Sequence, residues 1–313
     1  MPAPICLFVY RRPEHFVRTI EYLALNELAS PSPIFIFSDG PKSPEAVPAV
    51  EEVRRLARSV RGFSTVTVIE REKNFGLSRS IIAGVTDIIT RYGKVIVLED
   101  DMITSRYFLQ YMNDALDLYQ NDERVISAHG YLLPVTEKTS ETFFLRGADC
   151  WGWATWKHGW DLFEMDGRTL YDRVIAAGRE REFDYNGSYG YLRMLWDQIR
   201  GKNDSWAIRW YASAFLRDKL TLHPGISLVQ NIGNDASGTH CGALELYDTR
   251  LSDRQIKLGG IPVEHNQAMY RAFARVYAAS RSRRKVAAIN RNVAGFIRSL
   301  KNQVLGKRNT ICP

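Results

Sequence analysis

The chain has 313 residues, of which 45% are hydrophobic and 25% charged, a composition typical of a soluble globular protein with one or two domains. No apolar stretch approaches the roughly 20 residues that span a bilayer, and the N-terminus lacks the pattern of a signal peptide. Residues 265–313 carry eleven Lys and Arg residues and no acid. The whole chain has a net charge of +7, so residues 1–264 carry −4. Nucleic acid is therefore not the partner predicted for residues 1–264.

Strands and helices alternate through the first 131 residues. Strands are predicted at ICLFVY (5–10), IFIFSDG (34–40), TVTVIE (65–70), KVIVL (94–98) and RVISAHGY (124–131), and helices from Pro13 and over 44–59, 76–92 and 106–120. Alternation of this kind indicates an α/β fold, in which a mostly parallel sheet is wound by right-handed crossovers. Ligands bind such sheets at the carboxyl ends of the strands.

Polar clusters follow three of these strands, where we expect them to meet at one edge: Tyr10-Arg11-Arg12, Ser38-Asp39-Gly40 and Glu99-Asp100-Asp101. Three adjacent acids after a buried strand repel one another and lose hydration, so they need a cation or hydrogen-bond donors. A helix start, capped by Asp101 or Ser105, would explain one acid and leave two unexplained. We therefore favour a cation site. Residues 99 and 101 of an extended strand would face one side and residue 100 the other.

The second half of the sequence differs from the first in its tryptophan content and in its pattern of apolar residues. All seven tryptophans lie between residues 151 and 210, and the alternation of strand and helix is lost. We predict one domain over 1–265, with a first half (1–142) and a second half (143–265) that lays a mixed sheet and loops over the first half. Most of the tryptophans are expected to be core, with one or two exposed to a ligand. The four cysteines (Cys6, Cys150, Cys241 and Cys312) show no paired spacing, which predicts reduced thiols in a cytoplasmic protein.

Four stretches in order resemble GT-A glycosyltransferases, most closely the N-acetylglucosaminyltransferase I family and its bacterial relatives. They are KNFGLSRSIIAG (73–84), VIVLEDDM (95–102), NDSWAIRW (203–210) and HPGISLVQNIGNDASGTHCG (223–242). The resemblance covers roughly residues 4–242 in patches. It implies a nucleotide-sugar-dependent transferase that extends a bacterial surface polysaccharide, with 1–142 as the nucleotide-sugar half, 143–265 as the acceptor half, and one or two tryptophans stacked on the acceptor sugar. The transmembrane anchor of the family's Golgi members has no counterpart here, so a bacterial cytoplasmic form is the better match.

The resemblance also implies roles for the residues at the predicted donor site. Asp101 matches the metal-binding acid, and Glu99 and Asp100 match neighbours that face the ribose and the surroundings of the metal. Asp39 matches an acid that contacts uracil. Arg11 or Arg12 matches a basic residue at the end of the first strand, and Arg79 matches a residue of the nucleotide-sugar pocket, although Arg79 could equally make an ordinary surface ion pair. All-oxygen ligands suit Mn²⁺ or Mg²⁺.

On the acceptor side, Asp204 matches one of two adjacent acids near which the family places its general base. This chain has Asp204-Ser205 where the family has two acids, and NDS could instead cap a helix. Asp197 is the reserve base, and His240 could bind the metal or the diphosphate. A single-step displacement would invert the anomeric carbon.

The predicted donor is a UDP-sugar, UDP-N-acetylglucosamine being one candidate, and the predicted acceptor is a hydroxyl of a glycan or a lipid-linked glycan. Two other functions compete with this one. A sugar-phosphate nucleotidyltransferase would need a glycine-rich loop after the first strand, which YRRPEH lacks. A non-catalytic carbohydrate-binding protein would use the tryptophans as its platform.

The tail, residues 266–313, is predicted to be a basic amphipathic helix. Its apolar stripe would consist of Val286, Ile289, Val293, Phe296, Leu300 and Val304. Such a helix either binds an anionic membrane surface, here the inner face of the cell membrane, or packs on the body or on a second subunit of a homo-oligomer.

Overall fold

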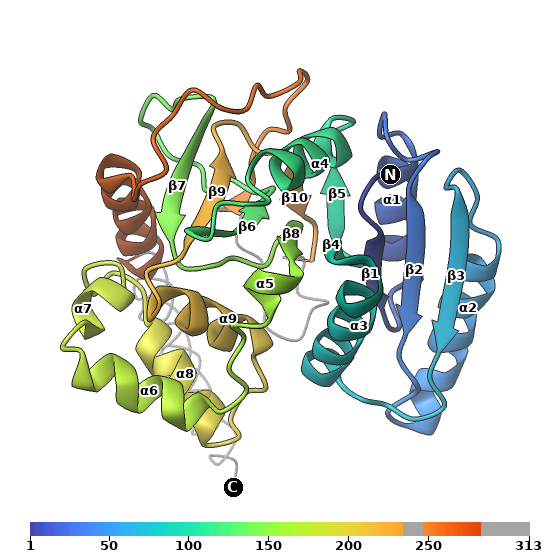
Figure 1. The fold of residues 1–313 in the computed structure, drawn as a ribbon. Coiled ribbons are helices and arrows are strands. Elements are labelled where there is room, and N and C mark those ends of the chain that lie inside the picture. Colours follow the sequence, from blue (N-terminus) through green and yellow to red (C-terminus); the bar gives the residue numbers. More distant parts are fainter. Residues whose placement is uncertain (234–246, 283–313) are drawn as a thin grey trace, which may run out of the picture.

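The computed structural model describes residues 1–233 and 247–282. Within them one eight-stranded sheet runs through the molecule in the order β3-β2-β1-β4-β8-β6-β9-β7 (Figure 1). The strands are β1 (Ile5–Val9), β2 (Pro33–Ser38), β3 (Thr65–Glu70), β4 (Lys94–Glu99), β6 (Val125–His129), β7 (Thr142–Arg146), β8 (Trp153–Trp156) and β9 (Leu220–Pro224). Strands β1 to β4 are parallel, β8 is antiparallel to both of its neighbours, and β7 is antiparallel to β9. The predicted mostly parallel α/β sheet is therefore confirmed.

Helices cover both faces of the sheet. Their bounds are α1 (Pro13–Ala24), α2 (Val47–Arg58), α3 (Leu77–Tyr92), α4 (Phe108–Leu118), α5 (Lys157–Trp160), α6 (Gly167–Ala176), α7 (Glu180–Phe183), α8 (Tyr191–Ile199) and α9 (Trp206–Phe215). A 3-10 turn (Pro44–Ala46) precedes α2, and a further helix begins at residue 267. No helix in the described part of the chain is long and apolar enough to cross a membrane.

Alternating side chains of the buried strands divide the core into two layers. Ile5 and Leu7 of β1 belong to the layer that contains residues of α1, α2 and α4, whereas Cys6 and Phe8 belong to the layer beneath α3 and α9. The run of apolar residues in each central strand is what burial on both faces requires. Both layers end at the carboxyl edge of β1 and β4, where polar residues begin.

The second half extends the sheet of the first half and does not lie over it. The prediction that the second half lies over the first was therefore wrong: β8, β9 and β7, with β6 of the first half between β8 and β9, continue the sheet edge to edge beyond β4. The mixed character predicted for this part of the sheet is confirmed. The helices α6, α8 and α9 pack together on one side of this extension (Figure 1). Trp153, Trp160, Trp206 and Trp210 form a buried aromatic cluster there, which confirms that most of the tryptophans are core.

Candidate functional site

The three acids lie at the carboxyl end of β4, as predicted, but only Glu99 belongs to the strand. Asp100 and Asp101 form a tight turn into β5 (Met102–Thr104), which pairs with β10 (Val229–Asn231). The backbone carbonyl of Asp101 accepts a hydrogen bond of 2.8 Å from the N–H of Ile232, so the segment after β10 closes over the turn. Both aspartates are buried, with 4% and 7% of their surface exposed.

Arg12, just after β1, is the nearest described cation to this turn. Its Nη2 pairs with Oδ1 of Asp100 and lies 2.9 Å from Oδ2 of Asp101. Both carboxylates therefore face the same guanidinium, and the predicted strand-like alternation of residues 99 to 101 was wrong because a turn replaces the strand at residue 100. The backbone N–H of Tyr10 donates to Oδ2 of Asp100 at 3.4 Å. The predicted meeting of the β1 and β4 ends is confirmed.

Burial and mutual repulsion perturb the protonation of this cluster. Burial, together with the charges of Asp101 and Asp100, raises the pKa of Glu99 to about 8. Burial also raises the pKa of Asp100, against the influence of Arg12. Burial of Arg12 acts to lower its pKa, but the two aspartates outweigh this effect and raise it. Three adjacent carboxyl groups are therefore buried beside a single guanidinium, and burial opposes the ionised form of Glu99 and Asp100.

The turn has a remaining oxygen ligand that fits a hard divalent cation. Oδ1 of Asp101 is buried and accepts no hydrogen bond from any group that the structure describes. An unsatisfied buried carboxylate oxygen is costly, and carboxylate oxygens are the ligands that Mn²⁺ and Mg²⁺ prefer. Gly233 allows the chain to pass close by, because a Cβ at this position would lie 2.2 Å from Oδ2 of Asp101. His240, the other predicted metal ligand, lies outside the described residues.

Asp39 lies at the end of β2 and holds the loop that precedes α3. Its Oδ1 accepts from the N–H groups of Gly40 (3.0 Å) and Phe75 (2.8 Å), and its Oδ2 accepts from the side-chain amide of Asn74 (3.1 Å) and the N–H of Gly76 (2.9 Å). Gly76 has a φ of +74°, a conformation that favours glycine. Asp39 thus has a structural role that the sequence did not reveal, and its contact with uracil stays a prediction.

This loop also places Arg79 at the same edge of the sheet. The ring of Phe75 lies between two guanidinium groups, with the Cζ atoms of Arg71 and Arg79 at 4.3 Å and 5.2 Å from its centroid. Cation–π contacts of this kind orient long basic side chains. Arg71 was not singled out from the sequence, because nothing in ERE (70–72) distinguishes it from a solvated residue. The role of Arg79 in donor binding stays a prediction.

Asp204 precedes α9 and is mostly solvated. Its side chain is 67% exposed, and its Oδ1 lies 3.7 Å from Nη2 of Arg209. The same Nη2 donates a hydrogen bond of 2.6 Å to the hydroxyl of Ser78 in α3, which ties this end of α9 to the helix that carries Arg79. The helix cap is Ser205, whose hydroxyl accepts from the N–H of Ile208 at 3.3 Å, so Asp204 is not needed as a cap. Its role as the base stays a prediction.

The reserve base, Asp197 in α8, is engaged in ion pairs on the surface. Its Oδ2 lies 2.9 Å from Nε of Arg193, and its Oδ1 lies 3.9 Å from Nζ of Lys202. The side chain of Asp197 is 22% exposed and its Oδ1 is buried, and its role as the reserve base stays a prediction.

A cluster that the sequence analysis missed contains His129, Asp149 and His223. One ligand atom from each of these residues lies within 4.8 Å of the other two. The two histidines are 94 residues apart and meet because β6 and β9 are neighbouring parallel strands. The sequence contains one signal for this cluster: in HGY (129–131) and HPG (223–225), each histidine lies at or near the end of an apolar run.

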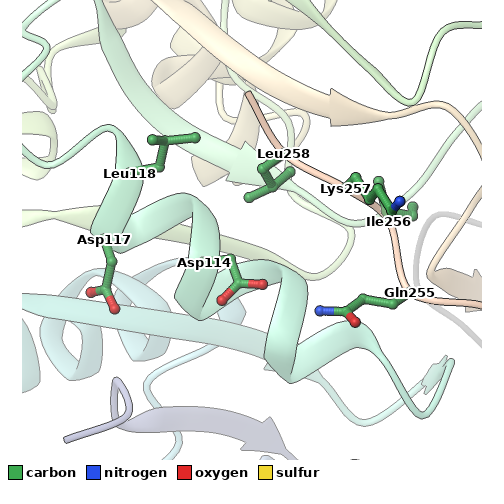
Figure 2. A pocket seen from close by; sticks show the side chains of 7 residues that line it. All are labelled: Asp114, Asp117, Leu118, Gln255, Ile256, Lys257 and Leu258. Atoms are coloured by element: carbon green, nitrogen blue, oxygen red, sulfur yellow. The ribbon is translucent and has the colours of Figure 1, made fainter. Parts of the chain in front are cut away.

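A surface hollow of about 640 Å³ lies between α4 and residues 255–258 (Figure 2). Asp117, which lines it, forms an ion pair of 2.8 Å with Lys94, the first residue of β4. The hollow is therefore near the amino end of the strand whose carboxyl end carries Glu99, and it does not belong to the acidic turn.

No protein-family model and no curated protein matches the chain. Similar solved structures are remote. S. aureus TarS in complex with UDP has 13% identity over 38% of this chain and 33% of that chain, with a TM-score of 0.30. The mannosyltransferase PcManGT from Pyrobaculum calidifontis, in complex with GDP-Man and Mn²⁺, has 14% identity over 42% of this chain and 38% of that chain, also with a TM-score of 0.30.

The matched regions span about a third to two fifths of the length of those chains, so neither match assigns an activity to this one. The architecture itself, a mostly parallel sheet flanked by helices with an acidic turn at the carboxyl edge of β4, is consistent with the GT-A fold.

Proposed function

We propose that the chain is a metal-dependent inverting glycosyltransferase that transfers a sugar from a UDP-sugar to a hydroxyl of a glycan or lipid-linked glycan. The observation that carries the proposal is the buried Oδ1 of Asp101, which accepts no hydrogen bond from any described group, in a turn of adjacent acids beside Arg12. In this proposal Asp101 holds Mn²⁺ or Mg²⁺, and Glu99 and Asp100 lie next to it. When bound, the cation supplies a Lewis acid for the leaving diphosphate.

The residues around the turn have complementary tasks in this proposal. Arg12 fixes the orientation of Asp100 and Asp101 through charge-assisted hydrogen bonds. Arg79 and Arg71, which flank Phe75, contribute positive charge to the donor side of the edge. The short connection from Tyr10 to Pro13, the first residue of α1, contains no glycine-rich phosphate loop, which favours sugar transfer over nucleotidyl transfer.

Transfer also needs a carboxylate that accepts the proton of the acceptor hydroxyl. The resemblance assigns this role to Asp204, which lies at the start of α9, joined through Arg209 to α3. Attack from the face opposite the diphosphate inverts the anomeric carbon without a covalent intermediate. The proposed membrane contact of the tail through residues 286–304, and its alternative of a second subunit, concern a segment outside the described residues.

The proposal is tested by incubating the protein with UDP-N-acetylglucosamine, UDP-glucose, UDP-galactose and GDP-mannose, each with Mn²⁺ or with EDTA. We expect release of UDP from a UDP-sugar with Mn²⁺ and none with EDTA. Release of UDP at the same rate in EDTA would contradict the metal-dependent mechanism. Consumption of UTP and a sugar phosphate with release of pyrophosphate would identify a nucleotidyltransferase.

A further inference from the structure

Asp149, His223 and His129 form a chain of polar groups of which only one end reaches solvent. The Nδ1 atoms of His129 and His223 are 3.4 Å apart, and Oδ2 of Asp149 lies 3.8 Å from Nε2 of His223 and 3.9 Å from Nδ1 of His129. The histidines are buried, with 3% and 1% of their surface exposed, whereas the side chain of Asp149 is 28% exposed. The carboxylate is therefore the accessible member, and the two rings lie behind it.

A backbone hydrogen bond fixes the protons in this chain. The N–H of Trp151 donates to Nε2 of His129 at 3.2 Å, so the proton of the neutral ring is on Nδ1. Nδ1–H of His129 then faces both Nδ1 of His223 (3.4 Å) and Oδ2 of Asp149 (3.9 Å); with Nδ1 of His223 as the acceptor, the proton of the second ring is on Nε2, toward Asp149. Burial lowers the pKa of His129 well below its ordinary value and that of His223 to about 3, so both rings are neutral at pH 7.

The same hydrogen bond argues against a metal in this cluster. A histidine that binds a metal through one nitrogen normally donates the N–H of its other nitrogen to a carbonyl or carboxylate. Nε2 of His129 instead accepts from the N–H of Trp151. A metal bound to Nδ1 of neutral His129 would require the ring proton on Nε2, where it would face the N–H of Trp151. The cluster is therefore better described as a relay that points an N–H at a carboxylate.

The relay shares the carboxyl edge of the sheet with the acidic turn. His129 pairs with Trp153, and Trp153 pairs with Val97, two residues before Glu99. Two strand spacings place His129 about 10 Å across the sheet from β4. A saccharide that reached from the turn to the relay would thus cross a distance of about one to two sugar rings.

Aromatic rings surround the relay on the side where a sugar could bind. The half-buried Trp151 ring lies 4.7 Å from that of Tyr131 and 6.0 Å from that of Tyr247. A large flat ring beside a carboxylate offers an apolar surface for the C–H face of a sugar and a charged acceptor for its hydroxyl. The hydroxyl of Tyr131 donates to the carbonyl of Tyr247 at 2.7 Å, which fixes this group of rings.

We propose that Asp149 binds the acceptor hydroxyl and takes its proton, with His223 and His129 as positioning residues; the inference rests on the proposed function and replaces Asp204 as the base. The hydroxyl proton moves to Asp149 while the acceptor oxygen forms a bond to the anomeric carbon. The bond from that carbon to the diphosphate oxygen breaks, and its electron pair leaves with the UDP. Asp204, beside α3, then contacts the donor.

The environment of Asp149 suits a base at neutral pH. Burial raises its pKa to about 6, close to the pH at which a general base works best. Buried tyrosines lie near it, and burial raises their pKa values, so their hydroxyls stay neutral: Tyr131, Tyr185, Tyr191, Tyr211 and Tyr277. Two further carboxyl groups act on these rings, Asp248 on Tyr131 and Asp184 on Tyr211.

The test compares three variants, Asp149→Asn, Asp204→Asn and His223→Gln. The control is His265→Gln, which changes a half-buried histidine away from the relay whose ring accepts a hydrogen bond from the N–H of Arg146 (3.1 Å). UDP affinity is measured by calorimetry with Mn²⁺. Turnover is measured as release of UDP from the three UDP-sugars, or of GDP from GDP-mannose, with a panel of octyl glycosides as acceptors. We expect Asp149→Asn to keep UDP affinity within threefold and to lose at least about 100-fold in kcat.

Asp204→Asn is expected to raise the donor KM with kcat within tenfold, and His265→Gln to match the wild type. His223→Gln replaces the fixed ring N–H that faces Asp149 with a flexible amide, which weakens its support of the ionised carboxylate, so the acidic limb of the pH profile of kcat/KM moves to higher pH. The inference is overturned if Asp149→Asn turns over within threefold of the wild type. It is also overturned if the wild type binds one zinc ion per chain and His223→Gln binds none. A wild type that binds no UDP, or binds it without turnover, instead contradicts the proposed function.

Discussion

Replacing Arg12 by Met should destabilise the metal-free protein and make it more responsive to Mn²⁺. Removing one partner of a fully buried ion pair costs about 3–5 kcal/mol because the remaining charge is uncompensated. Arg12 is 20% exposed and its partners are 5% and 9% exposed, so water screens part of this effect. We therefore expect a loss of about 2–3 kcal/mol in EDTA.

The assay is thermal unfolding followed by fluorescence, with Arg11→Met as the matched control. Arg11 is exposed and its guanidinium carbon lies 5.7 Å from the ring of its neighbour Tyr10, outside the acidic turn. At about 2 °C per kcal/mol for a chain of this size, Arg12→Met should lower Tm in EDTA by about 4–6 °C. Mn²⁺ should raise its Tm by more than it raises that of the wild type, because the cation replaces the lost positive charge. Equal Tm values for the two variants in EDTA, or equal responses to Mn²⁺, would refute this account of the turn.

Three further predictions concern neighbouring residues. The pKa of Glu99 is 4.5 in the unfolded chain and about 8 in the folded protein, so between these values the metal-free native state binds more protons than the unfolded state. Its stability therefore falls as pH rises through this range, by up to about 1.4 kcal/mol per pH unit. Glu99→Gln should flatten this slope in urea unfolding with EDTA, and an unchanged slope would argue against the raised pKa of Glu99. Gly233→Ala should weaken Mn²⁺ binding at least about 10-fold by displacing Asp101, whereas Gly190→Ala, whose Cβ would have only ordinary contacts, should not; calorimetry distinguishes them. Asp39→Asn turns an amide toward backbone N–H donors and should cost about 2–3 kcal/mol in urea unfolding; a loss below 0.5 kcal/mol would contradict its role in holding the loop before α3.

Much of the fold follows from local patterns in the sequence. Apolar runs such as VIVL (95–98) are buried on both faces, and polar residues directly after them must lie at a shared edge, which is why the meeting of Arg12 with Asp100 and Asp101 was predictable in outline. That both aspartates face one guanidinium was not predictable, because it depends on a turn at a position where the chain could have continued as a strand.

Contacts between distant segments were the features that the sequence did not reveal. The order of strands beyond β4 inserts the antiparallel β8 between β4 and β6, and no local pattern indicates this insertion. The pairing of His129 with His223 depends on that order, as does the approach of Asp149 to both. Three of the four hydrogen bonds accepted by Asp39 likewise come from a loop more than 30 residues away, so its location was predictable but these partners were not.

The most direct test of the central claim is the affinity for UDP, measured by calorimetry in Mn²⁺ and in EDTA for the wild type and for Asp101→Asn. If the buried oxygen of Asp101 holds the cation that holds the diphosphate, UDP binds the wild type only with Mn²⁺ and binds Asp101→Asn at least about 100-fold more weakly. Equal UDP affinity for the two proteins in Mn²⁺, or for the wild type with and without EDTA, would contradict the claim.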